Sequence, residues 1–129
     1  MRSIAGDQMD LMTWLEEYIF KAEAVAVTPE FCQIGTQLAM LEMIRTGTTT
    51  FVDMYYFENE IATATAAAGM RAILGQAVID FPVSDAPTPQ DALNLTEIVF
   101  QNWVDHPLIT PAVAPHAPHT VATLSLIHI

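Results

Sequence analysis

The chain of 129 residues has little positive charge, a single cysteine and no long apolar run. Four Lys and Arg against fifteen Asp and Glu give a net charge of −11. This balance argues against nucleic acid or an anionic membrane surface as a partner. No stretch approaches the ~18 consecutive apolar residues that a membrane span requires. Because one cysteine, Cys32, cannot form an internal disulfide, we predict a cytoplasmic protein.

The first part of the sequence is typical of two helices. Apolar residues at helical spacing predict a helix over residues 11–20. A second and longer helix is predicted after Thr28, which is a suitable N-cap, with Pro29 at the first helical position. Gly47 is expected to end this helix.

The rest of the sequence alternates between short apolar segments and helical ones. Three apolar segments predict strands, the first of them buried on both faces: 48–54, 70–79 and 108–113. Helices are expected between these strands, over residues 59–68 and 90–104. Such an alternation is typical of βαβ units and a parallel sheet.

Polar residues cluster just past the predicted strand ends: Asp53 and Tyr55, then Asp80, then His116 and His119. The carboxyl ends of parallel strands are where (β/α)8 barrels keep their chemistry. No glycine-rich phosphate-binding motif follows any strand, which disfavours an open nucleotide-binding sheet. A complete barrel takes roughly 250 residues. We therefore predict an α/β fold, a partial (β/α)8 TIM-type barrel of about three βα units.

His116 is the strongest candidate for a functional residue. Pro115 and Pro118 restrict the backbone around it, so its ring is a candidate metal ligand or a neutral hydrogen-bond donor to a substrate. The plainer interpretation is a surface turn that contains histidines. His116 and His119 do not by themselves make a metal site, because a catalytic zinc needs about three protein ligands.

The remaining candidates carry weaker signals. Asp53 and Asp80 are candidate acids, bases or ligands, or else caps of the loops that follow them. Glu23 lies between alanines on or just after the first helix, and composition alone leaves its role open. Cys32 has no positive charge nearby in the sequence to activate its thiol, so we interpret it as structural.

Five stretches share a pattern with one enzyme superfamily: AGDQMDLMTWL (5–15), WLEEYIFKAEA (14–24), LAMLEMIRTGTTTFVDMYY (38–56), GMRAIL (69–74) and TPAVAPHAPHT (110–120). Together they resemble the amidohydrolase superfamily, and more narrowly its 5-methylthioadenosine/S-adenosylhomocysteine deaminases. The runs E-M-I-R-x-G-T-T-T-F-x-D-M and A-P-H-A-P are specific to this group. The resemblance covers residues from about 2 to 123.

The resemblance implies a metal-bearing (β/α)8 barrel beside a small β-sandwich, and the hydrolytic deamination of an adenine nucleoside. It also implies a divalent metal, usually zinc, which lowers the pKa of a bound water. Glu23 matches a glutamate that is placed to bind the ribose hydroxyls, and His116 matches a histidine that contacts the substrate. We therefore expect both residues to bind a small-molecule nucleoside. His119 stands where the family usually has Tyr.

The family's metal ligands and catalytic residues have no match in this sequence, so we expect them outside the chain. Residues 1–123 are predicted to be a fragment of the catalytic barrel that is inactive alone. Residues 124–129, LSLIHI, are predicted to be a non-native tail in which His128 has no function. The sequence does not indicate whether the protein is a monomer or an oligomer.

Two alternatives stay open at this point. A related amidohydrolase acting on another ring, such as a triazine or guanine, offers no ribose hydroxyls for Glu23. A non-catalytic half-barrel that serves as an interaction module belongs to a different class. It leaves the edges of an unclosed parallel sheet exposed, which promotes aggregation.

Overall fold

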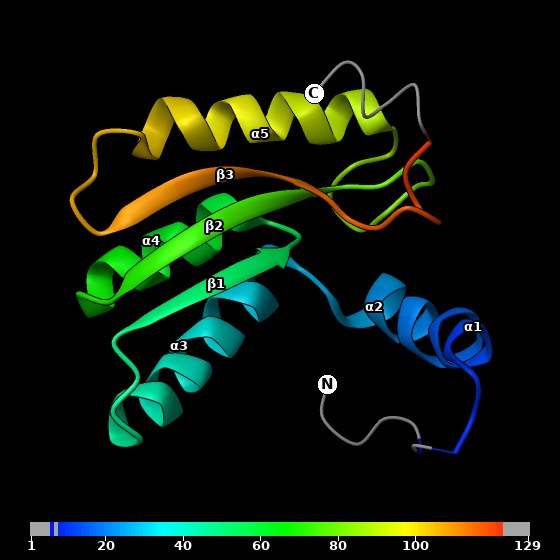
Figure 1. The fold of residues 1–129 in the computed structure, drawn as a ribbon, viewed down its shortest axis with the longest axis horizontal. Coiled ribbons are helices and arrows are strands. Elements are labelled where there is room, and N and C mark those ends of the chain that lie inside the picture. Colours follow the sequence, from blue (N-terminus) through cyan, green and yellow to red (C-terminus); the bar gives the residue numbers. More distant parts are fainter. Residues whose placement is uncertain (1–5, 7, 123–129) are drawn as a thin grey trace.

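The computed structural model describes residue 6 and residues 8–122, and Figure 1 shows how their helices and strands are arranged. The elements follow one another as α1 (Leu11–Thr13), η1 (Trp14–Ile19), α2 (Phe20–Ala26), α3 (Pro29–Arg45), β1 (Thr50–Tyr55), α4 (Glu58–Ala68), β2 (Arg71–Val78), α5 (Pro89–Trp103) and β3 (Ile109–Pro115). The three predicted strands and the helices between them are confirmed. The predicted tail, residues 124–129, lies outside the described residues.

The helical segments begin and end at the residues that the sequence indicates, with one extension. α1, the π-helical η1 and α2 follow one another directly, so the first helical segment runs to Ala26 and includes Glu23. The Thr28 hydroxyl accepts a hydrogen bond from the Phe31 N–H at 3.1 Å, which confirms the predicted N-cap of α3. After α3, Gly47 has a φ of 85°, a left-handed conformation that glycine adopts without strain.

The three strands form one parallel sheet in the order β1-β2-β3. Their carboxyl ends therefore meet at one end of the sheet. The helical segment 11–26 lies beside that end, on the right in Figure 1. This arrangement confirms an α/β fold with parallel strands, and it brings segments far apart in the sequence together where the strands end.

One face of the sheet is covered by helices. Phe51, Ala72 and Ile109 share one row of the sheet register, and they belong to or pack against the main core cluster. α4 packs on β2, and α5 packs on both β2 and β3. Within the described residues, no helix combines the length and the apolar character that crossing a bilayer requires.

Among the described residues, no helix covers the amino-terminal half of the opposite face, which we call the open face. Val52 is 71% exposed, and Ile73, beside it in the register, is 39% exposed. The prediction that the first strand is buried on both faces is therefore wrong, because its residues alternate between exposed and partly buried positions. An apolar segment alone does not indicate whether one or two layers cover it.

Candidate functional site

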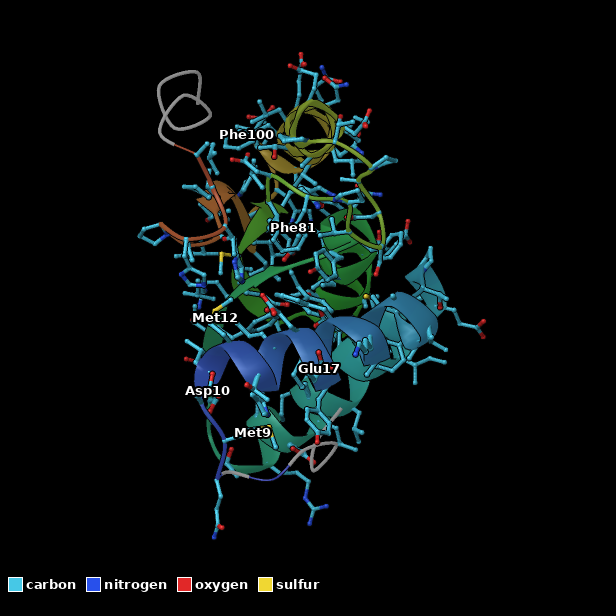
Figure 2. The ribbon with its side chains drawn as sticks, turned by 90° about the vertical axis from the view of Figure 1, so that its right-hand side faces the viewer. Met9, Asp10, Met12, Glu17, Phe81 and Phe100 are labelled. Carbon is cyan, nitrogen blue, oxygen red and sulfur yellow. The ribbon has the colours of Figure 1, made fainter. Side chains whose placement is uncertain are left out.

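A small cavity lies where the strands end and the first helical segment crosses them. Its volume is about 80 Å³, and it is lined by Leu15, Ile19, Phe20, Glu23, Met54, Tyr55, Tyr56, Ala77 and His116. Figure 2 looks onto this end of the molecule and shows the helical segment that carries Met12 and Glu17 in front of the sheet. The cavity thus joins the two residues that the sequence predicts as substrate-binding, Glu23 and His116.

Two tyrosine hydroxyls hold the carboxylate of Glu23. Tyr55 donates to Oε1 at 3.0 Å, and Tyr56 donates to Oε2 at 3.4 Å. The Ser84 hydroxyl also donates to the backbone carbonyl of Glu23 at 3.4 Å, which ties α2 to the loop after β2. Burial raises the pKa of Glu23, although both tyrosine hydrogen bonds work in the opposite direction by favouring the ionised form.

The tyrosines are suited to act as donors. Burial raises the pKa of both Tyr55 and Tyr56 well above the usual phenol value, and the nearby Glu23 charge raises it further. Both hydroxyls therefore keep their protons at neutral pH. The two rings lie 4.8 Å apart between centroids, so consecutive residues at the end of β1 reach the same carboxylate.

A buried polar network holds the turn that follows the tyrosines. Phe57 has a φ of 56°, which is unusual for a bulky side chain, and its N–H donates to Asp85 Oδ2 at 2.7 Å. The Gln76 side-chain amide donates to the same oxygen at 2.8 Å. The Tyr55 N–H donates to Glu58 Oε1 at 2.8 Å. These contacts fix the direction in which β1 ends.

Glu58 is fully buried, and burial raises its pKa to about 8, with the charges of Asp53 and Asp85 acting in the same direction. Among the described residues, Glu58 Oε2 and Asp85 Oδ1 are the buried side-chain oxygens that lack a hydrogen-bond partner. A proton on the Glu58 carboxyl avoids placing a second full charge in this network.

Hydrogen-bond contacts hold both the backbone and the ring of His116. Its backbone N–H donates to the Val78 carbonyl at 3.1 Å, which extends the pairing of β2 with β3. Its Nδ1 lies 2.8 Å from the Thr120 hydroxyl oxygen, and the Thr120 hydroxyl donates its proton to the Ala117 carbonyl at 3.1 Å. Burial lowers the pKa of His116, as does the neighbouring His119. The lowered pKa favours the neutral ring.

The other candidate residues do not line the cavity. Asp53 lies inside β1 rather than past its end, in register with Leu74 of the helix-covered core. The Asp80 side chain accepts a hydrogen bond from the Ala122 N–H, and its own N–H donates to the Thr120 carbonyl at 2.9 Å, so Asp80 joins the end of β2 to the turn after β3. His119 is exposed.

Cys32 is buried in the main core, and burial raises the pKa of its thiol to about 12. A protonated, buried thiol fits the structural role predicted for it. Sequence reasoning missed Tyr56 and Thr120, which contact the two predicted residues. Tyr56 follows the strand directly, so the tyrosine pair at 55–56 is the signal that was available.

No group of three or more His, Cys, Asp or Glu side chains within residue 6 and residues 8–122 is arranged to hold a metal ion. The described residues therefore do not fit a metal centre by themselves. The chemistry that they offer is recognition: a carboxylate with two fixed donors, and a neutral imidazole on the other side of the same cavity.

A parallel α/β sheet with polar residues at the carboxyl ends of its strands is typical of a (β/α)8-type barrel. The chain matches the Amidohydrolase family over residues 1–127, and it belongs to that family. Enzymes of this family are generally metal-dependent.

Its relatives include proteins named 5-methylthioadenosine/S-adenosylhomocysteine deaminase. The one from Syntrophobacter fumaroxidans is 48% identical over 115 residues, which are 89% of this chain and 26% of the relative. The one from Syntrophus aciditrophicus, numbered 1, is 50% identical over 119 residues, 92% of this chain and 27% of the relative. The chain thus spans about a quarter of the length of these relatives.

Solved structures agree with the fold. An adenosine deaminase from Xanthomonas campestris with bound zinc superposes with a TM-score of 0.92 at 37% identity, over 96% of this chain and 28% of that one. A guanine deaminase from Escherichia coli superposes with a TM-score of 0.79 over 96% of this chain and 30% of that one. At 18% identity, the second likeness shows the fold alone. The predicted partial barrel and its resemblance to amidohydrolases are confirmed.

Proposed function

We propose that this chain forms the nucleoside-binding part of a hydrolytic deaminase that acts on 5-methylthioadenosine or S-adenosylhomocysteine. In that reaction water replaces the amino group of the adenine ring, and ammonia leaves. The observation that carries the proposal is that Glu23 and His116, far apart in sequence, line one cavity at the carboxyl ends of the strands. The names of the relatives supply the substrate class.

Glu23 is proposed to accept hydrogen bonds from the ribose hydroxyls. An ionised carboxylate has about four lone-pair sites. The tyrosines use one site on each oxygen, so one site on each remains for a hydroxyl. A vicinal diol matches this arrangement, whereas a bare heterocycle such as guanine or a triazine offers nothing to bind there.

His116 is proposed to contact the adenine base. In the neutral imidazole, one nitrogen donates a hydrogen bond and the other accepts one. Because Nδ1 contacts Thr120, the nitrogen left for the base is Nε2. Thr120 therefore decides which tautomer the base meets. His119, where the family usually has Tyr, is exposed, and we assign it no contact with the nucleoside.

The metal of the intact enzyme is proposed to be zinc, held by ligands outside this chain. The likeness to a zinc-bound adenosine deaminase supports this assignment. We assign no metal ligand and no catalytic residue to the described residues, which bind and orient the nucleoside. The proposed substrate is a small molecule, and we propose a cytoplasmic location.

A chimeric enzyme tests the proposal. This chain replaces the matching segment of the Thermodesulfovibrio yellowstonii deaminase, to which it is 43% identical over 126 residues, 98% of its length. Ammonia release is measured with adenosine, 5-methylthioadenosine and guanine, and chloride release is measured with a chlorotriazine. Turnover of the nucleosides alone is expected. Turnover of guanine or the triazine alone establishes the runner-up reaction, and a folded, zinc-loaded chimera without any activity contradicts the proposal.

Two variants of the chimera test the individual roles. Glu23→Ala is expected to lower kcat/KM for adenosine, and an unchanged value contradicts the ribose role. His116→Ala is expected to lower kcat/KM by more than about tenfold, and a smaller loss counts against contact with the base. Circular dichroism and zinc content serve as controls for folding. If the chain instead serves as a non-catalytic interaction module, the chimera is expected to show no deaminase activity.

A further inference from the structure

A second cavity of about 240 Å³ is also lined by Glu23. Glu23, Tyr56 and Phe20 line both this cavity and the smaller one that contains His116. A ligand whose ribose contacts Glu23 is therefore adjacent to both cavities.

The second cavity is mainly apolar. Besides the shared residues, its wall consists of Ala24 on α2 and of Phe81, Pro82, Val83 and Ser84 in the loop after β2. Phe20 and Phe81 meet edge to face, with ring centroids 5.4 Å apart. Figure 2 labels Phe81 above the helical segment that passes in front of the sheet. Aromatic edges and small aliphatic groups are a favourable environment for a thioether.

The charge around this cavity disfavours an anionic group. Its lining contains the carboxylate of Glu23 and no Lys or Arg. Of the cations in the described residues, Lys21 is bound to Glu17, while Arg45 ends α3 and Arg71 begins β2, at the amino end of the sheet. A carboxylate placed here loses hydration and gains no opposite charge from the described residues.

We propose that this second cavity binds the substituent on the 5′ carbon of the ribose, and that it selects an uncharged alkylthio group over a charged amino-acid tail. This inference rests on the proposed function, because it needs the ribose at Glu23. The inference assigns a binding site to the 5′ substituent, a part of the substrate for which the proposed function names no contact. Burying a methylthio group against apolar walls contributes about tenfold in kcat/KM, by the usual value of one or two buried carbons.

The test compares adenosine, 5-methylthioadenosine and S-adenosylhomocysteine as substrates of the chimera described above. We expect kcat/KM for 5-methylthioadenosine to exceed that for adenosine by about tenfold. Phe81→Ala is expected to remove most of this preference, because it lowers kcat/KM for 5-methylthioadenosine more than kcat/KM for adenosine. Phe81→Arg is expected to raise the ratio of S-adenosylhomocysteine to 5-methylthioadenosine turnover by at least about tenfold, because it supplies a cation.

Two further variants keep the test decisive. Ala24→Phe fills the cavity without removing a core side chain, and it is expected to abolish the preference for the methylthio group. Ile98→Ala, at a 44% exposed position on α5, is the control and is expected to leave all three ratios unchanged. An equal loss for adenosine and 5-methylthioadenosine in Phe81→Ala, or a preference that survives both cavity variants, overturns the inference. Failure of the chimera to deaminate any nucleoside refutes the proposed function itself.

Discussion

The pair of tyrosines on Glu23 allows a quantitative prediction about ribose recognition. Removing one hydroxyl at a time, by Tyr55→Phe and Tyr56→Phe, leaves the aromatic rings in place and deletes only a donor. The two hydrogen bonds differ in length, 3.0 Å for Tyr55 and 3.4 Å for Tyr56. The shorter one contributes more, since hydrogen bonds weaken toward the upper end of the distance range.

The size of the effect follows from the environment of the carboxylate. Hydrogen bonds to charged groups contribute about 1.5–3 kcal/mol. Glu23 is only partly buried, so water replaces part of a lost donor and the lower end of that range applies. We therefore expect Tyr55→Phe to weaken ribose recognition about tenfold, and Tyr56→Phe less than about fivefold.

The assay uses the chimera and compares kcat/KM for adenosine with that for 2′,3′-dideoxyadenosine, which lacks both hydroxyls. The ratio of the two values isolates the contribution of the ribose from that of the base. Tyr18→Phe is the matched control, because Tyr18 is 41% exposed on η1 and lies outside the lining of the cavity. It is expected to leave the ratio unchanged.

The pH dependence gives an independent readout. The Tyr55 hydrogen bond opposes the increase in the pKa of Glu23 that burial causes. Without it the pKa rises further, so protonation of Glu23 weakens nucleoside binding from a higher pH in Tyr55→Phe than in the parent. A larger loss of ribose recognition in Tyr56→Phe than in Tyr55→Phe refutes the reasoning. So does a Tyr55→Phe variant whose activity falls at the same acidic pH as that of the parent.

Four further predictions address the rest of the chain. Thr120→Val is expected to lower kcat/KM of the chimera about tenfold through the tautomer of His116, and Thr120→Ser to restore it, with unfolding midpoints as the control. Gly75→Ala is expected to destabilise the chain by about 1–3 kcal/mol in urea unfolding, because the new Cβ lies 2.6 Å from that of Ala114, and Ala114→Gly to recover part of this loss. Because Glu58 has a folded-state pKa of about 8 against an ordinary 4.5, the free energy of unfolding is expected to fall as pH rises through that interval, and Glu58→Gln to flatten the fall. The purified chain alone is expected to hold far less than stoichiometric zinc by inductively coupled plasma analysis, and a stoichiometric content contradicts the placement of the ligands outside it.

Most of the fold could be predicted from local signals. Helical spacing, the N-cap at Thr28 and the glycine at 47 are properties of consecutive residues, and the structure confirms them. The coverage of a strand is a property of distant segments. The sequence around Val52 is as apolar as a fully buried strand, and only the register with β2 and the missing second layer make it exposed.

In the candidate site, too, some positions follow from local sequence and others depend on distant segments. The position of His116 follows from a strand and two prolines, all local. The place of Glu23 depends on how the helical segment 11–26 packs at the carboxyl ends of the strands. The spacing of apolar residues in the sequence does not indicate this packing. Its assignment came from the resemblance alone. The hydrogen bond from Tyr56 to Glu23 comes just before Phe57, which has a left-handed backbone conformation. A bulky side chain gives no sequence signal for that conformation.

The open face of the sheet explains why the proposed ligand site lies at the carboxyl end of the strands. In the row that holds Val52 and Ile73, near the amino ends, the side chains are large. Toward the carboxyl ends, β2 and β3 place only Gly75, Ala77 and alanines at 112 and 114 on this face. In a closed (β/α)8 barrel this face is the interior, which layers of bulky side chains normally fill. The small residues near the carboxyl ends of β2 and β3 leave space on this face. Ala77 lines the cavity that contains Glu23 and His116. The size gradient along these two strands therefore leaves space at the carboxyl end of the sheet, where we propose that the nucleoside binds.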